Sequence, residues 1–176
     1  AVSGVDSRYG DDLKIGVWQG LADKDPDVDA IYRLVNDGET IFRNEQSEYA
    51  LDAGCYCPFN SQNTTWTSEL AALMYLPHTV TFRYTDILRG YIAQRIMWAY
   101  GWRLGFCGAN VIQERNVHNL MEDLKDEFPM YTSIEKVVDI LDNAVLSKDI
   151  YRDLLFVYGR LAEAGIVKQE EIPSVE

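Results

Sequence analysis

Two guanidinium groups and one carboxylate stand where the hydrophobic period of the chain changes. Residues 79–98 (TVTFRYTDILRGYIAQRIMW) open with alternating apolar and polar residues, which predicts a short strand. Apolar residues then recur at helical spacing, so we expect a helix to begin near Thr85. Arg83, Asp86 and Arg89 lie at this change, and open α/β folds place ligand contacts where strands end. The sequence therefore predicts half of a ligand site here.

An acidic segment supplies a second set of candidates. Four aspartates alternate with other residues in residues 20–30 (GLADKDPDVDA), whose glycine, proline and acids predict a loop. A calcium loop needs glycine at its sixth position and glutamate at its twelfth. Counted from Asp23, those positions hold Val28 and Leu34, which argues against calcium. Two interpretations stay open: an Asp-x-Asp pair that holds Mg²⁺ or Mn²⁺ against a diphosphate, and a solvated turn, which the composition favours.

The second half of this acidic loop adjoins an apolar segment that contains a cation. Asp27 and Asp29 lead directly into residues 30–35 (AIYRLV), which we expect to be extended and which contain Arg33. Acids at the edge of a strand beside an arginine suggest a fixed polar network. We therefore count Asp27, Asp29 and Arg33 among the candidate substrate-binding residues.

A third set consists of amide side chains. Asn60, Gln62 and Asn63 follow residues 55–60, a segment with the composition of a strand. Amides in such a position hydrogen-bond ligand hydroxyls, and they are equally suited to turn formation. They are the remaining candidates for substrate binding.

Asp86 is the candidate catalytic residue, acting as a base or as a ligand of substrate hydroxyls. It falls in the first turn of the expected helix, where the helix dipole favours its ionised form. The alternative is that it caps the helix. Arg83 and Arg89 offer planar guanidinium groups for phosphate or carboxylate. The alternative for Arg89 is an ion pair with Asp86, three residues earlier on the helix.

These candidates would be positioned by a mixed α/β fold that gives way to helices. Pro129 is expected to end one helix, and Thr132 or Ser133 to cap the next. Ser147 is expected to cap the last helix, which Gly165 closes. The expected strands are 15–18, 30–35, 41–43, 55–60, 79–83 and 103–107; the expected helices are 68–76, 85–98, 119–128, 134–145 and 148–164, before a frayed acidic tail.

The bulk composition excludes several classes of protein. The 176 residues suggest one domain or part of one, and 47% hydrophobic residues are enough for a packed core. A net charge of -12 argues against a general binder of nucleic-acid backbones, which need clustered cations. No apolar run approaches the ~18 residues of a membrane span. The three cysteines lack zinc-site spacing, so we interpret them as core or partly exposed thiols.

Three blocks of sequence resemble a known family. GVWQGLADKDPDVDAIYRL, CPFNSQNTTW and LPHTVTFRYTDILRGYIAQRIMW occur in this order and span roughly residues 15–112. Together they resemble the plant Golgi STELLO glycosyltransferases and their relatives in bacteria, protists and nematodes. The third block is the most specific, with Arg83, Asp86, Arg89 and Trp98 standing as in that family. A fainter likeness is to the reversibly glycosylated polypeptides, which include UDP-arabinopyranose mutases.

The resemblance implies a GT-A-like fold. We expect this chain to be the C-terminal, acceptor-side portion of a mixed-sheet glycosyltransferase domain with a helical C-terminal appendix. Residues 1–118 would form the α/β part and residues 119–176 the helical part of the same domain. The nucleotide-binding half, and most ligands of a divalent metal (Mn²⁺ or Mg²⁺), are expected upstream. Such enzymes often use a late histidine as a metal ligand, which makes His118 a candidate; a surface histidine at a helix start is the alternative.

The expected function is sugar transfer from a nucleotide sugar to a carbohydrate or glycan acceptor. The alternative is a non-catalytic scaffold with a degenerate glycosyltransferase fold. Either protein would meet an upstream half or a partner chain, in the cytoplasm of a bacterial relative or in the Golgi lumen of a plant-like one. Trp66 and Trp98 offer rings for stacking on sugars, although a core position is the favoured interpretation for both.

Overall fold

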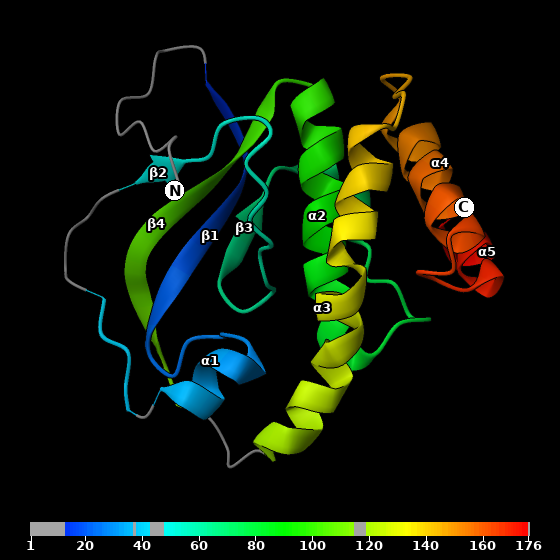
Figure 1. The fold of residues 1–176 in the computed structure, drawn as a ribbon. Helices are drawn as coiled ribbons and strands as arrows, with labels where there is room; N and C mark the ends of the chain where they lie inside the picture. The colour runs from blue at the N-terminus through cyan, green and yellow to red at the C-terminus, as the bar shows by residue number, and fades with distance from the viewer. Residues whose placement is uncertain (1–12, 37, 43–47, 115–118, 176) are drawn as a thin grey trace.

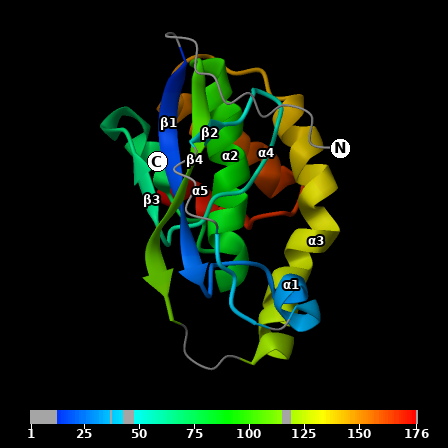
Figure 2. The same cartoon turned by 90° about the vertical axis from the view of Figure 1, so that its left-hand side faces the viewer.

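The computed structural model describes residues 13–36, 38–42, 48–114 and 119–175. A mixed sheet forms one layer, and α2 lies against one of its faces, with α3 and α4 packed on α2 on that same side (Figures 1 and 2). The elements are β1 (Lys14–Lys24), α1 (Ala30–Val35), β2 (Tyr49–Ala50), β3 (Thr64–Trp66), the 3₁₀ helices η1 (Ser68–Met74) and η2 (Phe82–Tyr84), α2 (Thr85–Ala99), β4 (Trp102–Gln113), α3 (Leu120–Asp142), α4 (Ile150–Glu163), η3 (Gln169–Glu171) and α5 (Ile172–Val175). Within these residues, no helix combines the length and the apolar character needed to cross a membrane.

The two long strands form the centre of the sheet, whose order is β2-β4-β1-β3. β1 and β4 are parallel, and the short strands β2 and β3 pair antiparallel at the edges. Both central strands are longer than the sequence indicates. β1 continues to Lys24, so the acidic loop begins at Asp25, and β4 continues past Gly108 to Gln113. Their pairing extends both strands, since each supplies the other with a hydrogen-bonded neighbour.

The central helix α2 confirms the predicted helix near Thr85, and it packs against β4, η1, α3 and α4. Its buried side chains lie on more than one face, because the helix is enclosed between the sheet and other helices. They are Leu88, Arg89, Ile92, Ala93, Gln94, Ile96 and Met97.

The strand predicted just before α2 is wrong. The residues before Phe82 have no regular structure, and Phe82–Tyr84 form the 3₁₀ turn η2. Tyr84 turns inwards, where it is buried and its hydroxyl hydrogen-bonds the Ser133 hydroxyl at 2.9 Å. The Thr81 hydroxyl donates to the carbonyl of Asp126. These side-chain contacts with α3 hold the segment in place of pairing with a strand. The alternating pattern therefore does not correspond to a strand.

Other strand predictions also fail. Residues 30–35 form the helix α1, which begins because the Asp29 carboxylate accepts a hydrogen bond from the Tyr32 N–H at 2.9 Å. Residues 41 and 42 and residues 55–60 lack regular structure, and position 43 lies outside the described residues. The strand that follows the segment 55–60 is β3. Local capping and side-chain hydrogen bonds outweighed β propensity at these places.

The C-terminal region differs most from its prediction. α3 runs unbroken through Pro129, where the sequence predicted a break, and the hydroxyls of Thr132 and Ser133 donate to carbonyls of the preceding turn instead of capping a new helix. Asp149, rather than Ser147, caps α4. Gly165 ends α4 with a φ of 74°, as predicted. The described part of the tail folds into η3 and α5, where the sequence predicted fraying.

Candidate functional site

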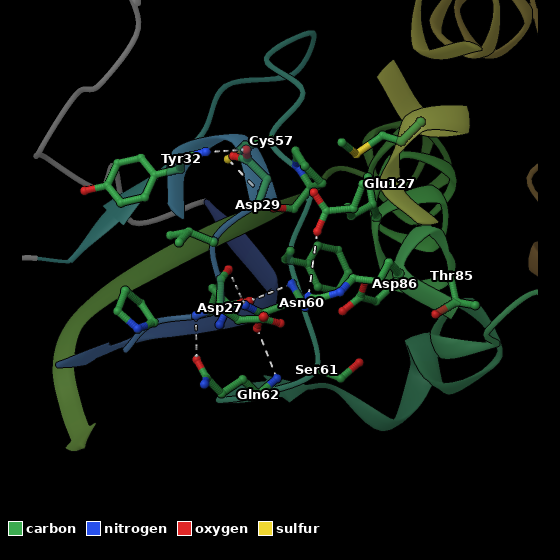
Figure 3. A pocket seen from close by; sticks show the side chains of 18 of the residues that line it. Asp27, Asp29, Tyr32, Cys57, Asn60, Ser61, Gln62, Thr85, Asp86 and Glu127 are labelled. Atoms are coloured by element: carbon green, nitrogen blue, oxygen red, sulfur yellow. Dashed lines mark hydrogen bonds and ion pairs between the residues drawn. The ribbon is translucent and has the colours of Figure 1, made fainter. Parts of the chain in front are cut away.

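An open cavity of about 1030 Å³ lies between the loops around α1, the N-terminal end of α2 and the first half of α3 (Figure 3). Segments far apart in sequence form its walls: residues 19–22 of β1, the loop 26–29, the loop 57–62, the turn into α2, and α3. It brings together most of the predicted site residues: Asp27, Asp29, Asn60, Gln62, Arg83 and Asp86.

The other predicted residues do not line the cavity. Arg89 is buried, with 3% of its surface exposed. Arg33 donates to the carbonyls of Val28 and Pro26 and so braces the loop before α1. Asn63 donates to the Leu21 carbonyl and to Asn110 across the sheet. His118 lies outside the described residues.

Three buried polar side chains fix the loop 57–62. Gln94 of α2 accepts from the Cys57 N–H and donates to its carbonyl, at 3.1 and 2.7 Å. Gln19 of β1 accepts from the Asn60 N–H at 3.0 Å. Arg89 donates to the Phe59 carbonyl at 3.1 Å. This loop is therefore held by hydrogen bonds to side chains of β1 and α2, which place its amides at the cavity wall.

The absence of a side chain at Gly90 lets the same loop approach α2. A Cβ at this position would stand 2.9 Å from the Phe59 nitrogen and 3.1 Å from the Pro58 Cα. Both atoms belong to the backbone, so neither can move aside easily. Gly90 and Arg89 together connect the wall of the cavity to the helix that carries Asp86.

Asp86 lies in the first turn of α2 and points into the cavity. Burial raises the pKa of its carboxyl, and the negative charge of Asp27 raises it further. The positive charge of Arg89 and the N–H groups at the start of the helix oppose this rise without cancelling it. The result is a carboxylate that binds a proton more readily than an exposed aspartate does.

Arg83 meets two acids that the sequence did not connect with the site. Its guanidinium forms an ion pair with Asp123 and lies 3.7 Å from the Glu127 Oε1. Both acids belong to α3, and all three side chains are largely shielded from solvent. Much of the Arg83 charge is therefore balanced within the protein.

Glu127 also fastens α1 to α3. Its Oε2 accepts from the Ala30 N–H at 2.7 Å and from the Tyr131 hydroxyl at 3.3 Å. The Tyr131 hydroxyl also donates to Asp29 at 2.9 Å. Burial raises the pKa of Glu127, and the charge of Asp29 adds to that effect, while the Ala30 N–H and Arg83 act against it.

The sequence prediction did not connect Asp123, Glu127 and Tyr131 with the site, and the break expected at Pro129 separated Tyr131 from the other two. These residues follow one another at intervals of four, so a continuous helix carries them on one face. That spacing was the available signal. Tyr131 falls between the expected helices 119–128 and 134–145, so the face that the three residues share could not be recognised from that prediction.

The cavity carries more negative than positive charge. Among the described residues that line it, one is a cation, Arg83, and six are acids: Asp27, Asp29, Asp86, Asp123, Asp126 and Glu127. Even so, the part of the chain that the structure describes holds no grouping of three or more His, Cys, Asp or Glu side chains suited to a metal ion. The lining offers hydrogen-bond acceptors in excess, which suits a ligand rich in hydroxyl donors.

Comparison with known proteins confirms the resemblance to STELLO glycosyltransferases. Residues 83–163 match the model of that family. The chain is also 31% identical, over 90 residues, to two proteins of Arabidopsis thaliana named "Probable glycosyltransferase STELLO2" and "Probable glycosyltransferase STELLO1". The aligned part is 48% of this chain and 12% of each relative, so the chain spans a small part of their length. The family match begins at Arg83 and includes all of α3 and α4, beyond the end of the resemblance seen in the sequence.

Proposed function

We propose that this chain forms the acceptor side of a sugar-transfer site, in a GT-A-like enzyme that uses a nucleotide-sugar donor. The family match over residues 83–163 supports glycosyl transfer, and this range includes Arg83, Asp86, Asp123 and Glu127 of the cavity. The donor-binding half, with any Mn²⁺ or Mg²⁺ that it holds, would come from other residues of the full protein.

One observation carries the proposal: a carboxylate with a raised pKa faces a cavity that is rich in acceptors. Sugar transfer needs a group that takes the proton of the acceptor hydroxyl as the hydroxyl attacks the donor. A general base works best when its pKa approaches the working pH. The burial of Asp86 moves its pKa in that direction, and the helix fixes its position.

The charge of the cavity favours the acceptor over the diphosphate as its ligand. A diphosphate needs cations, and Arg83 is already paired with Asp123 and near Glu127. The buried Arg89 is occupied by the Phe59 carbonyl and the Ser61 hydroxyl. Neutral hydroxyls, in contrast, donate hydrogen bonds to carboxylates without the repulsion that a phosphate meets.

Asp86→Asn tests the role of this carboxylate, because it keeps the shape of the side chain and removes its basicity. We expect sugar transfer by the full-length protein to fall roughly 10²- to 10⁴-fold, the usual contribution of a general base. The measurement is release of the nucleotide from a panel of UDP-sugars with and without candidate acceptors. Asp52→Asn, at an exposed turn outside the cavity, is the matched control. A wild-type rate in Asp86→Asn would contradict the assignment.

A thermal-shift measurement on the full-length protein distinguishes an enzyme from a non-catalytic scaffold. A ligand that binds only the folded state raises the melting temperature. We expect UDP-sugars with Mn²⁺ to raise the Tm of the full-length protein. The absence of a shift with every nucleotide sugar in the panel would favour the scaffold.

A further inference from the structure

Phe82 stands at the cavity with its ring in solvent. Its exposed fraction is 86%, although it belongs to the cavity lining. Leu76, which also lines the cavity, is 44% exposed. We propose that Phe82 and Leu76 form an apolar platform for a second sugar ring of the acceptor, so that the substrate is a glycan of at least two units. This inference rests on the proposed function and adds the class of acceptor to it.

The exposure of Phe82 does not come from a loose segment. The Phe82 carbonyl accepts from the hydroxyl of Thr85 at 2.8 Å. The next residue, Arg83, is ion-paired with α3, and Tyr84 is buried. The preceding Thr81 is tied to α3 through its hydroxyl. The backbone is thus fixed on both sides of Phe82, although the Phe82 ring itself packs little against the protein core.

An exposed aromatic ring on a fixed backbone, in a cavity that also contains hydroxyl-binding groups, matches the two-sided chemistry of a sugar. A pyranose ring presents C–H groups on its faces and hydroxyls around its edge. An aromatic face buries the former, and carboxylates or amides bind the latter. Phe82 precedes Asp86 by four residues, and Asn60 and Gln62 line the same cavity. A sugar unit held by the polar groups at Asp86 would therefore leave the next unit near Phe82.

The size of the cavity agrees with a ligand of more than one sugar. Pockets for drug-sized ligands hold roughly 300–1,000 Å³. The cavity of about 1030 Å³ slightly exceeds that range, which is more space than one monosaccharide fills.

The tryptophans that offered stacking rings in the sequence do not occupy this position. Trp66 lies on the edge strand β3 and does not line the cavity. Trp98 packs against Tyr56, with ring centroids 4.5 Å apart. Among the described aromatic residues that line the cavity, Phe82 is the most exposed, at 86% against 42% for Tyr32, and it precedes Asp86 by four residues.

A glycan array tests the platform, with the full-length protein and its Phe82→Ala and Phe82→Trp variants. We expect the wild type to bind a subset of glycans of two or more sugars. Phe82→Ala should weaken that binding roughly 3- to 10-fold, as expected for the loss of an aromatic contact, and Phe82→Trp should retain it. Phe128→Ala is the matched control, because Phe128 is 59% exposed and does not line the cavity. An unchanged Tm in Phe82→Ala verifies that folding is intact.

The outcomes separate this inference from the proposed function. Equal glycan binding by Phe82→Ala and wild type would overturn the proposed platform. An array on which the wild type binds no glycan would overturn it as well. In either case, loss of sugar transfer in Asp86→Asn would still support the proposed function. If Phe82→Ala loses glycan binding while Asp86→Asn keeps wild-type transfer, the platform stands and the role of Asp86 fails.

Discussion

Glu171 and Glu127 are both buried, at 0% and 2% exposure, yet their surroundings drive ionisation in opposite directions. Glu171, in η3, accepts from the Tyr75 hydroxyl at 2.5 Å and from the N–H groups of Thr79 and His78 at 2.9 and 3.1 Å. Burial alone would raise the pKa of Glu171, but these hydrogen bonds outweigh burial and hold the pKa below its usual value.

Glu127 also accepts hydrogen bonds, but it lies among other acids. Asp29 shares the Tyr131 hydroxyl with it, and Asp123 competes for Arg83. Burial and this excess of acceptors leave the pKa of Glu127 raised. The comparison shows that burial of a carboxylate does not by itself indicate function. The tail region satisfies its carboxylate with several donors from the protein, whereas Glu127 shares its donors with the neighbouring acids Asp29 and Asp123.

The largest expected effect comes from Glu171→Ala, which leaves three donors of the 75–79 segment without their acceptor. We expect a loss of about 3 kcal/mol of unfolding free energy and a fall in Tm of roughly 6 to 12 °C. The measurement is thermal or urea denaturation. Glu170→Ala is the control, since the neighbouring side chain is exposed and pairs only weakly with Lys168 at 3.5 Å. Equal stability of the two variants would mean that Glu171 does not anchor the tail.

Next in size is the contrast between Gly90→Ala, at the cavity, and Gly159→Ala, in α4. The new methyl group at Gly90 meets the backbone of Pro58 and Phe59, so we expect a loss of about 2 kcal/mol. At Gly159 a Cβ meets nothing within 4 Å, so the better helix propensity of alanine should stabilise by about 0.5–1 kcal/mol. Denaturation curves give both values, and the same sign for both variants would refute the packing argument.

The smallest effect is a pH dependence whose sign distinguishes the two carboxylates. Because the pKa of Glu127 is raised on folding, its contribution to stability is greatest below its ordinary pKa and falls as pH rises through the folded pKa. The contribution of Glu171 is present above its ordinary pKa and is lost as pH falls through its lowered folded pKa.

Urea denaturation between pH 3 and 8 measures this difference, because the contribution of Glu171 is lost only below its ordinary pKa. Glu127→Gln should gain stability relative to wild type as the pH rises, and Glu171→Gln should lose stability relative to wild type over the same rise. Asp86, whose pKa is also raised, is present in each protein and cancels from the comparison. A Glu127→Gln variant that loses stability with rising pH would show that its ion pair with Arg83 outweighs burial.

The sequence predicted part of this arrangement, because some of its signals are local. The period of apolar residues located α2, and the positions of Arg83 and Asp86 at its start follow from that period. The amides of Asn60 and Gln62 were found because polar residues after an apolar segment are visible without a structure. Their chemical roles stay predictions that the variants above will test.

The features that the sequence did not predict depend on contacts between distant segments. The alternating residues 79–83 read as a strand, but no neighbouring strand meets them. Residues 30–35 have β-prone side chains, yet Asp29 and α3 hold them as a helix. α3 continues through Pro129 because Glu127 is held by the Ala30 N–H on one side, and the hydroxyls of Thr132 and Ser133 bond backbone carbonyls on the other. The contacts of Arg89 with the loop 57–62, and of Glu127 with α1, join segments far apart in sequence, so they are visible only in the structure.

The parallel pairing of β1 with β4 has a consequence for how the protein folds. Residue 14 pairs with residue 102, so the central ladder joins segments separated by most of the first hundred residues. Closing so long a loop costs conformational entropy before the strands form their stabilising contacts, which makes such pairing slow. The loops 26–29 and 57–62 both lie within that span. During synthesis, β1 can pair with β4 only after residues 102–113 have been made. The two loops that form walls of the cavity are therefore positioned late, after the central sheet has formed.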